Sequence, residues 1–425
     1  MSAFLLLQNS YSPYIINTEK CHVAYRKEYI DMLSQEMVKL GTNRSVIRDL
    51  FEYGNKRKEE IGADKVFDFS LGNPSVPAPS CVKEAALDLL QNGDELLLHS
   101  YTSAQGDAGV RKTIADYINA QHGTNLTADS LYITVGAAAS LTISLKALAE
   151  EGDEFITFAP FFPEYRVFVE NTGSKLVVVD SDPKDFQIDS AAFEQAITPH
   201  TKGIILNSPN NPSGVVIREE CIKRVCEILE KKQREYGHAI FLIADEPYRE
   251  LVYGEVKVPY LMNYYDNTIV CYSYSKSLSL PGERIGYIAV SDKAEDWKMI
   301  YAAICGAGRA LGYVCAPSMF QQVVARCMGQ TSDVSVYKKN RDLLYNALTE
   351  YGYRCIKPDG AFYLFVEALE KDANAFAEKA KEFELLIVPA DSFGTPGFVR
   401  ISYCVSTEQI ERALPAFQAL AESYR

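Results

Sequence analysis

The chain has 425 residues, of which 47% are hydrophobic and 23% are charged, and its formal net charge is −13. This composition excludes a disordered chain, and the length allows two or three domains. No apolar run approaches the roughly 20 residues that a membrane-spanning helix needs. The negative charge disfavours nucleic acids and anionic membranes as general partners.

The ten cysteines and five histidines show no metal-ligand spacing, and no CxxC pair occurs. We therefore expect no metal ion and reduced thiols. The apolar run at residues 4–7 is too short for a secretory signal and has no basic segment before it. These features predict a cytoplasmic protein.

The N-terminal region contains two predicted helices after an irregular start. Residues 1–13 show no clear period, which is compatible with a disordered tail or with an arm lying on a neighbouring molecule. Apolar residues from Tyr29 to Leu40 recur at helical spacing and predict a helix over 26–40. Ser45 is a suitable N-cap for a second helix.

From about residue 66 short β-branched or aromatic runs alternate with helical segments, which is typical of strands joined by crossover helices. The clearest helices are at 137–149 and 218–235. We predict an α/β fold whose large domain has a seven-stranded, mainly parallel sheet, where ligands bind beyond the carboxyl ends of the strands. The predicted strands are 131–135, 154–158, 175–179, 203–206, 240–243, 268–271 and 285–290.

After about residue 317 the alternation weakens and a smaller α+β domain is predicted. Its elements are a helix at 337–351, a strand at 361–366, a helix at 373–383, a strand at 399–402 and a closing helix from residue 407. The expected domains are a large one at 66–318, a small one at 14–65 and 319–425, and an N-terminal arm at 1–13.

Polar groups follow several predicted strands and suggest a pyridoxal phosphate site. A lysine can form a Schiff base with an aldehyde, and a carboxylate can keep a pyridine nitrogen protonated. Serine, arginine and the start of a helix can hold a phosphate. These groups stand in the segments NNPSG at 210–214, DEPY at 245–248, SYSK at 273–276, Arg284, and GAAA at 136–139.

In their order and spacing these segments resemble the signature blocks of the fold type I, class I/II pyridoxal-phosphate-dependent aminotransferases, a family that includes the aspartate aminotransferases. The similarity extends from FSLGNP at 69–74 to Arg400. It implies reversible transfer of an amino group between an L-amino acid and a 2-oxo acid in a ping-pong cycle, within amino acid metabolism and biosynthesis. It also implies a homodimer with shared active sites.

The resemblance assigns a role to each matching residue. Lys276 would hold the cofactor as an imine and then move the substrate proton, Asp245 would pair with the pyridine nitrogen, and Tyr248 would hydrogen-bond the ring hydroxyl. Arg400 would bind the substrate α-carboxylate through a planar guanidinium. The further cofactor-binding residues implied are Asn211, Phe162, Gly136, Ala137, Ala138, Ser273, Ser275, Arg284 and, reaching the neighbouring subunit, Tyr101. The further substrate-binding residues implied are Gly72, Asn211 and Arg309.

The sequence departs from the family pattern at two places. Ser208 is an extra residue in the asparagine-rich run, and residues 137–139 lack the polar side chain often found there. Arg309 lies near, but not at, the register of the arginine that binds a distal carboxylate in some aspartate aminotransferases, so the alternative is an arginine on a helix surface or one that caps the backbone.

Some of these motifs also occur in proteins with other functions. A C–S β-lyase similar to cystathionine β-lyase would share every cofactor contact, so it stays the alternative enzyme. The SYSK run also fits the S-x-x-K element of penicillin-binding enzymes, but the S-D-N and K-T-G partners are missing. No G-x-G-x-x-G follows the first strand, which argues against a dinucleotide-binding site. No helix-turn-helix segment precedes the domain, which argues against a ligand-sensing transcription regulator.

Overall fold

The computed structural model describes residues 33–42 and 45–425. The chain divides into two units, residues 1–49 and residues 50–425, and each is described by itself. The predicted arm at 1–13 and the first part of the helix expected over 26–40 lie outside the described residues. In the first unit, helix α2 (Gln35–Thr42) has no buried residue.

Helix α3 (Val46–Ile61) begins directly after Ser45. The Ser45 hydroxyl accepts a hydrogen bond from the backbone N–H of Arg48 at 3.4 Å, which confirms the predicted N-cap. Further along this helix Arg57 pairs with Glu384, and Lys58 pairs with Asp68 at 3.0 Å. These contacts join the C-terminal half of α3 to Glu384 in the C-terminal part of the chain and to Asp68, shortly after the helix.

All seven predicted strands form one sheet, in the order β2-β8-β7-β6-β5-β3-β4. The five strands from β7 to β4 are parallel, while β8 is antiparallel to both of its neighbours. The strands are β2 (Leu131–Thr134), β3 (Glu154–Ala159), β4 (Lys175–Asp180), β5 (Thr201–Asn207), β6 (Phe241–Asp245), β7 (Thr268–Ser273) and β8 (Gly286–Val290).

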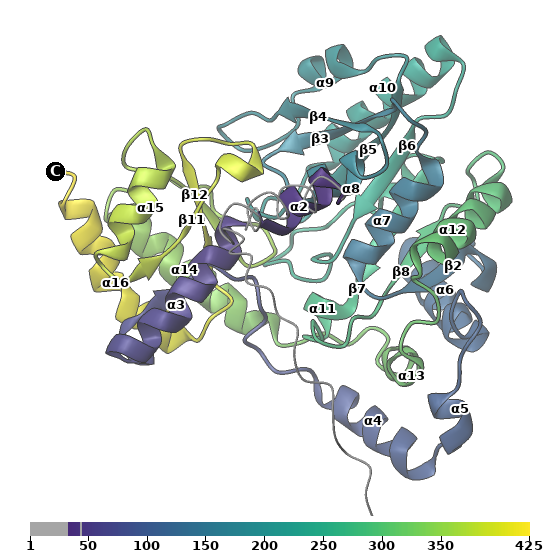
Figure 1. Cartoon of the computed structure of the whole chain (residues 1–425), viewed down its shortest axis with the longest axis horizontal. Helices are drawn as coiled ribbons and strands as arrows, with labels where there is room; N and C mark the ends of the chain where they lie inside the picture. Colours follow the sequence, from purple (N-terminus) through teal and green to yellow (C-terminus); the bar gives the residue numbers. More distant parts are fainter. Residues whose placement is uncertain (1–32, 43–44) are drawn as a thin grey trace, which may run out of the picture. The chain divides into compact units, whose positions relative to one another are not determined.

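Helices cover both faces of this sheet (Figure 1). Successive residues of β5 alternate between two hydrophobic clusters, because neighbouring side chains on a strand point to opposite faces. Ile204 and Leu206 pack on the face covered by α6 and α10, whereas Ile205 packs on the face covered by α7, α8 and α12. Both faces are buried, which explains why the strands are apolar runs without alternation.

The helices of this part of the chain connect the strands or extend beyond them. Two of them match the helices predicted at 137–149 and 218–235, namely α7 and α10. The helices of this part are α4 (Ser80–Asn92), α5 (Glu95–His99), α6 (Ala108–His122), α7 (Ala137–Leu148), α8 (Glu164–Glu170), α9 (Ser190–Ala196), α10 (Glu219–Tyr236), α11 (Tyr274–Ser277), α12 (Trp297–Leu311) and α13 (Ser318–Arg326).

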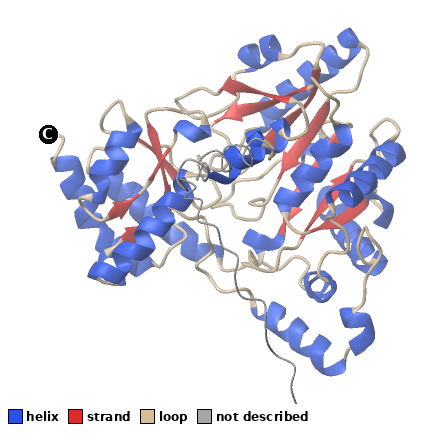
Figure 2. Ribbon diagram, viewed as in Figure 1, coloured by secondary structure: helices blue, strands red, loops and turns tan. Residues whose placement is uncertain are grey.

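The C-terminal part forms a separate antiparallel sheet, flanked by its own helices (Figure 2). Its strand order is β11-β12-β9, and a two-stranded parallel pair, β1-β10, accompanies it. The elements are β1 (Phe67–Asp68), α14 (Val334–Glu350), β9 (Tyr363–Glu367), α15 (Ala373–Lys381), β10 (Leu385–Leu386), β11 (Val388–Pro389), β12 (Phe398–Ser402) and α16 (Thr407–Glu422).

A third hydrophobic cluster fills this C-terminal part and includes Phe69 and Val76 from the segment after β1. This packing supports an organisation into a large domain and a small domain built from both flanks of the large one. The domain boundaries themselves stay a prediction, and the position of Phe69 and Val76 favours a start of the large domain after residue 76 rather than at 66.

Candidate active site

The carboxyl ends of three adjacent parallel strands bring polar side chains to one edge of the sheet. Asn207 ends β5, Asp245 ends β6 and Ser273 ends β7. The strand register places Asn207 opposite Asp245, and Asp245 opposite Cys271. The Asn207 side chain donates to the Asp245 carbonyl at 2.8 Å and accepts from the Asn211 N–H at 2.7 Å, so it ties the loop after β5 to the end of β6.

The Asp245 carboxyl is buried, with 5% of the residue exposed. Its Oδ2 accepts a hydrogen bond from the Tyr165 hydroxyl, whereas its Oδ1 is buried without a partner. Burial raises the pKa of Asp245 to about 7. A donor placed at Oδ1, such as a protonated ring nitrogen, would satisfy this oxygen and favour the charged carboxylate.

Lys276 lies on the short helix α11, which starts immediately after β7. Its Nζ donates to the Gly72 carbonyl at 2.7 Å and lies 5.4 Å from the centre of the Phe362 ring. Burial lowers the pKa of this amine to about 8. Among the ion pairs of the described residues none involves Lys276, so no carboxylate offsets the loss of solvent.

Arg400 on β12 is 2% exposed, and it forms no ion pair with any acidic side chain that the structure describes. Its Nη1 donates to the Asn211 Oδ1 at 3.1 Å and its Nη2 to the Ser70 carbonyl at 2.6 Å, while Nε has no partner. Burial lowers the pKa of this guanidinium. A buried cation without a counter-ion is a suitable site for a ligand carboxylate.

Tyr363 on β9 connects several members of the site. Its hydroxyl is 2.9 Å from the Tyr248 hydroxyl, and its ring centre lies 4.7 Å from the guanidinium carbon of Arg400. A side chain on Gly72 would collide with the Tyr363 hydroxyl, so this position requires glycine. Burial raises the pKa of Tyr248 well above its usual value, which keeps its hydroxyl protonated as a donor.

The start of α7, the end of β7, α11 and Arg284 bring several hydrogen-bond donors together. Gly136 precedes α7 with φ 97°, and a Cβ there would lie 2.7 Å from an Arg284 guanidinium nitrogen. The Ser273 and Ser275 hydroxyls are 2.8 Å apart, and Arg284 Nη1 is 3.5 Å from the Ser275 hydroxyl. The free N–H groups of Ala137 and Ala138 lie in the first turn of α7. An N-terminal helix turn with an arginine and two serines can hold a phosphate.

Three predicted site residues lie outside these contacts. Phe162 lies in the segment between β3 and α8 and packs edge-to-face on Tyr165, with ring centres 5.7 Å apart. Tyr101 is 95% exposed. Arg309 is exposed in the last turn of α12. The contribution of Tyr101 and Arg309 to a site in another copy of the chain stays a prediction.

Sequence reasoning missed two residues that contact the predicted ones, Tyr165 and Tyr363. Tyr165 lies three positions after Phe162, so a helical turn predicted near residue 163 would have placed both side chains on the same face of the helix. Tyr363 was included in a predicted strand only as an apolar member. Alternation along that strand would have separated it from Leu364 and directed attention to its hydroxyl.

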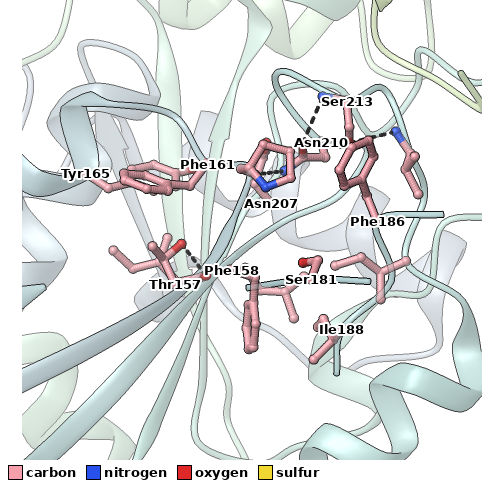
Figure 3. A pocket seen from close by; sticks show the side chains of 15 residues that line it. Thr157, Phe158, Phe161, Tyr165, Ser181, Phe186, Ile188, Asn207, Asn210 and Ser213 are labelled. Atoms are coloured by element: carbon pink, nitrogen blue, oxygen red, sulfur yellow. Dashed lines mark hydrogen bonds between the residues drawn. The ribbon is translucent and has the colours of Figure 1, made fainter. Parts of the chain in front are cut away.

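A small cavity lies next to the site (Figure 3). Tyr165, Phe161, Asn207 and Asn210 are among its lining residues, and its volume is about 20 Å³. This volume suits about one water molecule and is far too small for a cofactor ring. The cavity is therefore too small to receive the cofactor, although Tyr165, which holds Asp245, is one of its lining residues.

Within residues 33–42 and 45–425, no helix is long and apolar enough to cross a membrane. In the same part of the chain no group of three or more histidine, cysteine or acidic side chains could hold a metal ion.

Comparisons with known proteins agree with this geometry. The model of the family described as aminotransferase class I and II matches residues 64–417. A probable aspartate aminotransferase of Methanocaldococcus jannaschii is 30% identical over 387 residues, which cover 89% of this chain and 97% of that protein. An aspartate aminotransferase of Thermotoga maritima is 28% identical and covers 85% of this chain and 92% of its own length.

Solved structures show the same similarity. An aminotransferase from Eubacterium rectale superposes with a TM-score of 0.91 at 58% identity, covering 93% of this chain and 99% of its own. The aspartate aminotransferase of Thermus thermophilus with maleate superposes with a TM-score of 0.80 at 25% identity, covering 91% and 99%. With its fold, strand-end residues and family match, the chain belongs to the class I and II aminotransferases, which are fold type I enzymes dependent on pyridoxal 5′-phosphate.

Proposed function

We propose that the residues at this sheet edge form the active site of the aminotransferase, with Lys276 as the catalytic base. The observation that carries the proposal is the buried Lys276 amine, which faces a carbonyl and has a pKa lowered to about 8. At pH 7 about a tenth of such an amine is neutral, compared with less than about 0.1% at a pKa of 10.5. Only the neutral amine can attack an aldehyde or accept a proton.

The residues of the site fit pyridoxal phosphate. The unpartnered Oδ1 of Asp245 can accept from the ring nitrogen, and the donors around Gly136 and Arg284 can hold the phosphate. The Tyr248 hydroxyl and the Asn211 amide can donate to the ring hydroxyl. When bound, the cofactor supplies an aldehyde that condenses with amines and a ring that accepts the electron pair of a substrate C–H bond.

The chain's own residues then orient the substrate. Arg400 binds the two oxygens of the α-carboxylate through its planar guanidinium. The Tyr363 ring covers one face of this guanidinium and reduces its contact with water. The Gly72 carbonyl accepts a hydrogen bond from the free Lys276 amine. With the cofactor bound, the neutral Lys276 amine would take the proton from the substrate Cα and deliver it to the carbon that the cofactor aldehyde contributes.

The preferred donor is proposed to be aspartate or another L-amino acid of a broad set. Support comes from the names of the relatives, since that of Methanocaldococcus jannaschii is a probable aspartate aminotransferase and that of Thermotoga maritima is an aspartate aminotransferase. Arg309 is the candidate for binding a distal carboxylate. It is exposed and would act from a second copy of the chain.

We also propose that the chain acts as a homodimer. Tyr101 is 95% exposed, and Leu96 and Leu97 in the nearby helix α5 are 80% and 75% exposed. Exposed apolar side chains so close together along the chain support an interface with a second copy. The proposed compartment is the cytoplasm, because the sequence shows no secretory signal at residues 4–7. The proposed role in amino acid biosynthesis follows from the resemblance to the aminotransferase family.

The half-reaction with single amino acids tests this function. The holoenzyme is mixed with aspartate, alanine, an aromatic amino acid or cystathionine, and absorbance and products are recorded. Transfer predicts conversion of the cofactor to its aminated form with one equivalent of the matching 2-oxo acid. Continuous release of pyruvate and ammonia without the aminated cofactor would instead identify a β-lyase and refute the proposal.

A further inference from the structure

The carboxyl group of Asp245 is held unequally at its two oxygens. Oδ2 accepts from the Tyr165 hydroxyl, and Oδ1 has no partner. Among the described residues Tyr165 is the side chain that donates a hydrogen bond to this carboxyl. One oxygen is therefore fixed by the protein and the other is left available.

The other titratable groups near Asp245 cannot replace this donor. Glu246 follows it in the chain and is paired with Arg249, whose Nε is 2.6 Å from the Glu246 Oε2. Cys271 on the adjacent strand and Tyr248 act on the same carboxyl only through space. Glu246 opposes ionisation of Asp245, so the hydrogen bond from Tyr165 is the favourable contact of the charged form.

Tyr165 is rigidly placed for this contact. It lies in the first turn of α8, is buried, and its N–H donates to the Phe162 carbonyl at 3.0 Å. Its ring packs against Phe161 and Phe162, with ring centres 6.5 and 5.7 Å away, and Figure 3 shows it beside Phe161. The segment that carries Phe162, a predicted cofactor-binding residue, thus also carries the partner of Asp245.

We propose that Tyr165 is a positioning residue that fixes the Asp245 carboxyl through Oδ2, so that Oδ1 is presented to the pyridine nitrogen of the cofactor. The inference rests on the proposed site and adds a residue that acts through Asp245. Burial raises the pKa of Tyr165 well above its usual value, so the hydroxyl keeps its proton and remains a donor. Without it, the carboxyl is free to rotate and is protonated more readily.

The test compares Tyr165→Phe with the matched variant Tyr265→Phe. Tyr265 is also buried, and its hydroxyl donates to the Ile240 carbonyl at 2.6 Å. Each substitution removes one hydroxyl without leaving a large cavity. Two quantities are measured for each variant: the dissociation constant of pyridoxal phosphate, and the pH at which the Asp245 carboxyl band of the apo-protein changes in difference infrared spectra. An Asp245→Asn protein identifies that band.

We expect Tyr165→Phe to weaken cofactor binding by about tenfold or more, since it removes a hydrogen bond to a charged group. The carboxyl should also titrate at higher pH, whereas Tyr265→Phe should change neither quantity. In an Asp245→Asn background, Tyr165→Phe should have no further effect on cofactor affinity, because the two residues act through one contact. Unchanged affinity and an unchanged carboxyl titration in Tyr165→Phe would overturn the inference.

Both readouts are independent of turnover. A protein that binds the cofactor and shows the expected shift, but eliminates rather than transfers, would contradict the proposed function and leave the role of Tyr165 intact. Weakened binding that persists undiminished in the Asp245→Asn background would show that Tyr165 acts on packing alone and would refute the positioning role.

Discussion

Replacing Arg400 by methionine should separate catalysis from stability. The substitution keeps an unbranched side chain but removes the guanidinium that would bind the substrate α-carboxylate. Two charge-assisted hydrogen bonds, each contributing about 1.5–3 kcal/mol, place the loss of transition-state binding at about 3–6 kcal/mol. This corresponds to a fall of about 10²- to 10⁴-fold in kcat/KM for every amino acid donor.

The same substitution should not lower the free energy of unfolding. Arg400 is buried, its Nε has no partner, and burial lowers its pKa, so the free chain holds a poorly compensated charge. We therefore expect Arg400→Met to be at least as stable to urea as the parent, because an uncharged side chain removes the desolvation penalty. The charge at this position serves the ligand rather than the fold.

Arg341 provides the matched control. It is also buried, but its Nη2 pairs with Asp342 at 2.7 Å and its guanidinium carbon lies 4.5 Å from the Tyr253 ring centre. Arg341→Met should lose stability and keep the kcat/KM of the folded enzyme. The reasoning fails if Arg400→Met stays within tenfold of the parent for several amino acids, or if it is destabilised as much as Arg341→Met.

Two further changes test other parts of the site, and a third, at the buried Glu250, tests the pH dependence of stability. Lys276→Ala should reduce turnover by about 10³-fold or more while the cofactor still binds without covalent attachment, and borohydride followed by mass spectrometry will show whether the attachment is lost. Arg309→Ala should reduce kcat/KM for aspartate at least about tenfold more than for alanine, and equal effects on both would remove Arg309 from the site. Burial raises the pKa of Glu250 to about 7, so the folded chain keeps a proton that the unfolded chain releases near pH 4.5, and the free energy of unfolding falls as the pH rises between these values. Glu250→Gln should flatten this slope and raise the free energy of unfolding by about 2 kcal/mol at pH 8. The part of the slope that is due to Asp245 should remain. Parallel profiles of urea stability against pH for the parent and the variant would contradict the assignment of the slope to Glu250.

The core of the site could be predicted because its residues follow strands that are strongly marked in the sequence. Asp245 directly continues an apolar run, and Lys276 follows another by a few residues. In a parallel sheet neighbouring strand ends meet at one edge, so the chain order of these residues already implied their proximity. Arg400 was accessible only through the resemblance to a family, since an arginine inside a strand gives no sign of what it binds.

The contacts that the sequence did not reveal depend on packing between elements. Tyr165 reaches Asp245 from a seven-residue helix that begins after Pro163, and its charged neighbours Glu164 and Arg166 give no sign that its hydroxyl binds a buried carboxyl. The pair β1-β10 joins two strands of two residues each, separated by more than 300 positions. Strands so short have no periodicity, because at least four residues are needed to show an alternation.

A carboxyl, an amine and a guanidinium of the site have pKa values displaced towards the neutral form. Burial raises that of Asp245 to about 7, lowers that of Lys276 to about 8 and lowers that of Arg400. For Asp245 and Arg400 the charged form lacks a partner at Oδ1 and at Nε in the free chain, and the bound molecules would supply a ring nitrogen and a carboxylate. For Lys276 the neutral form is the one that condenses with the aldehyde. The cofactor should therefore stabilise the fold beyond simple occupancy of a preformed pocket. At a free concentration of 100 times its dissociation constant, mass action alone gives about 2.7 kcal/mol. Because the cofactor nitrogen favours the charged form of Asp245, its addition should also reduce the loss of stability between pH 5 and pH 7, and this coupling follows from the unpaired oxygen of that carboxyl.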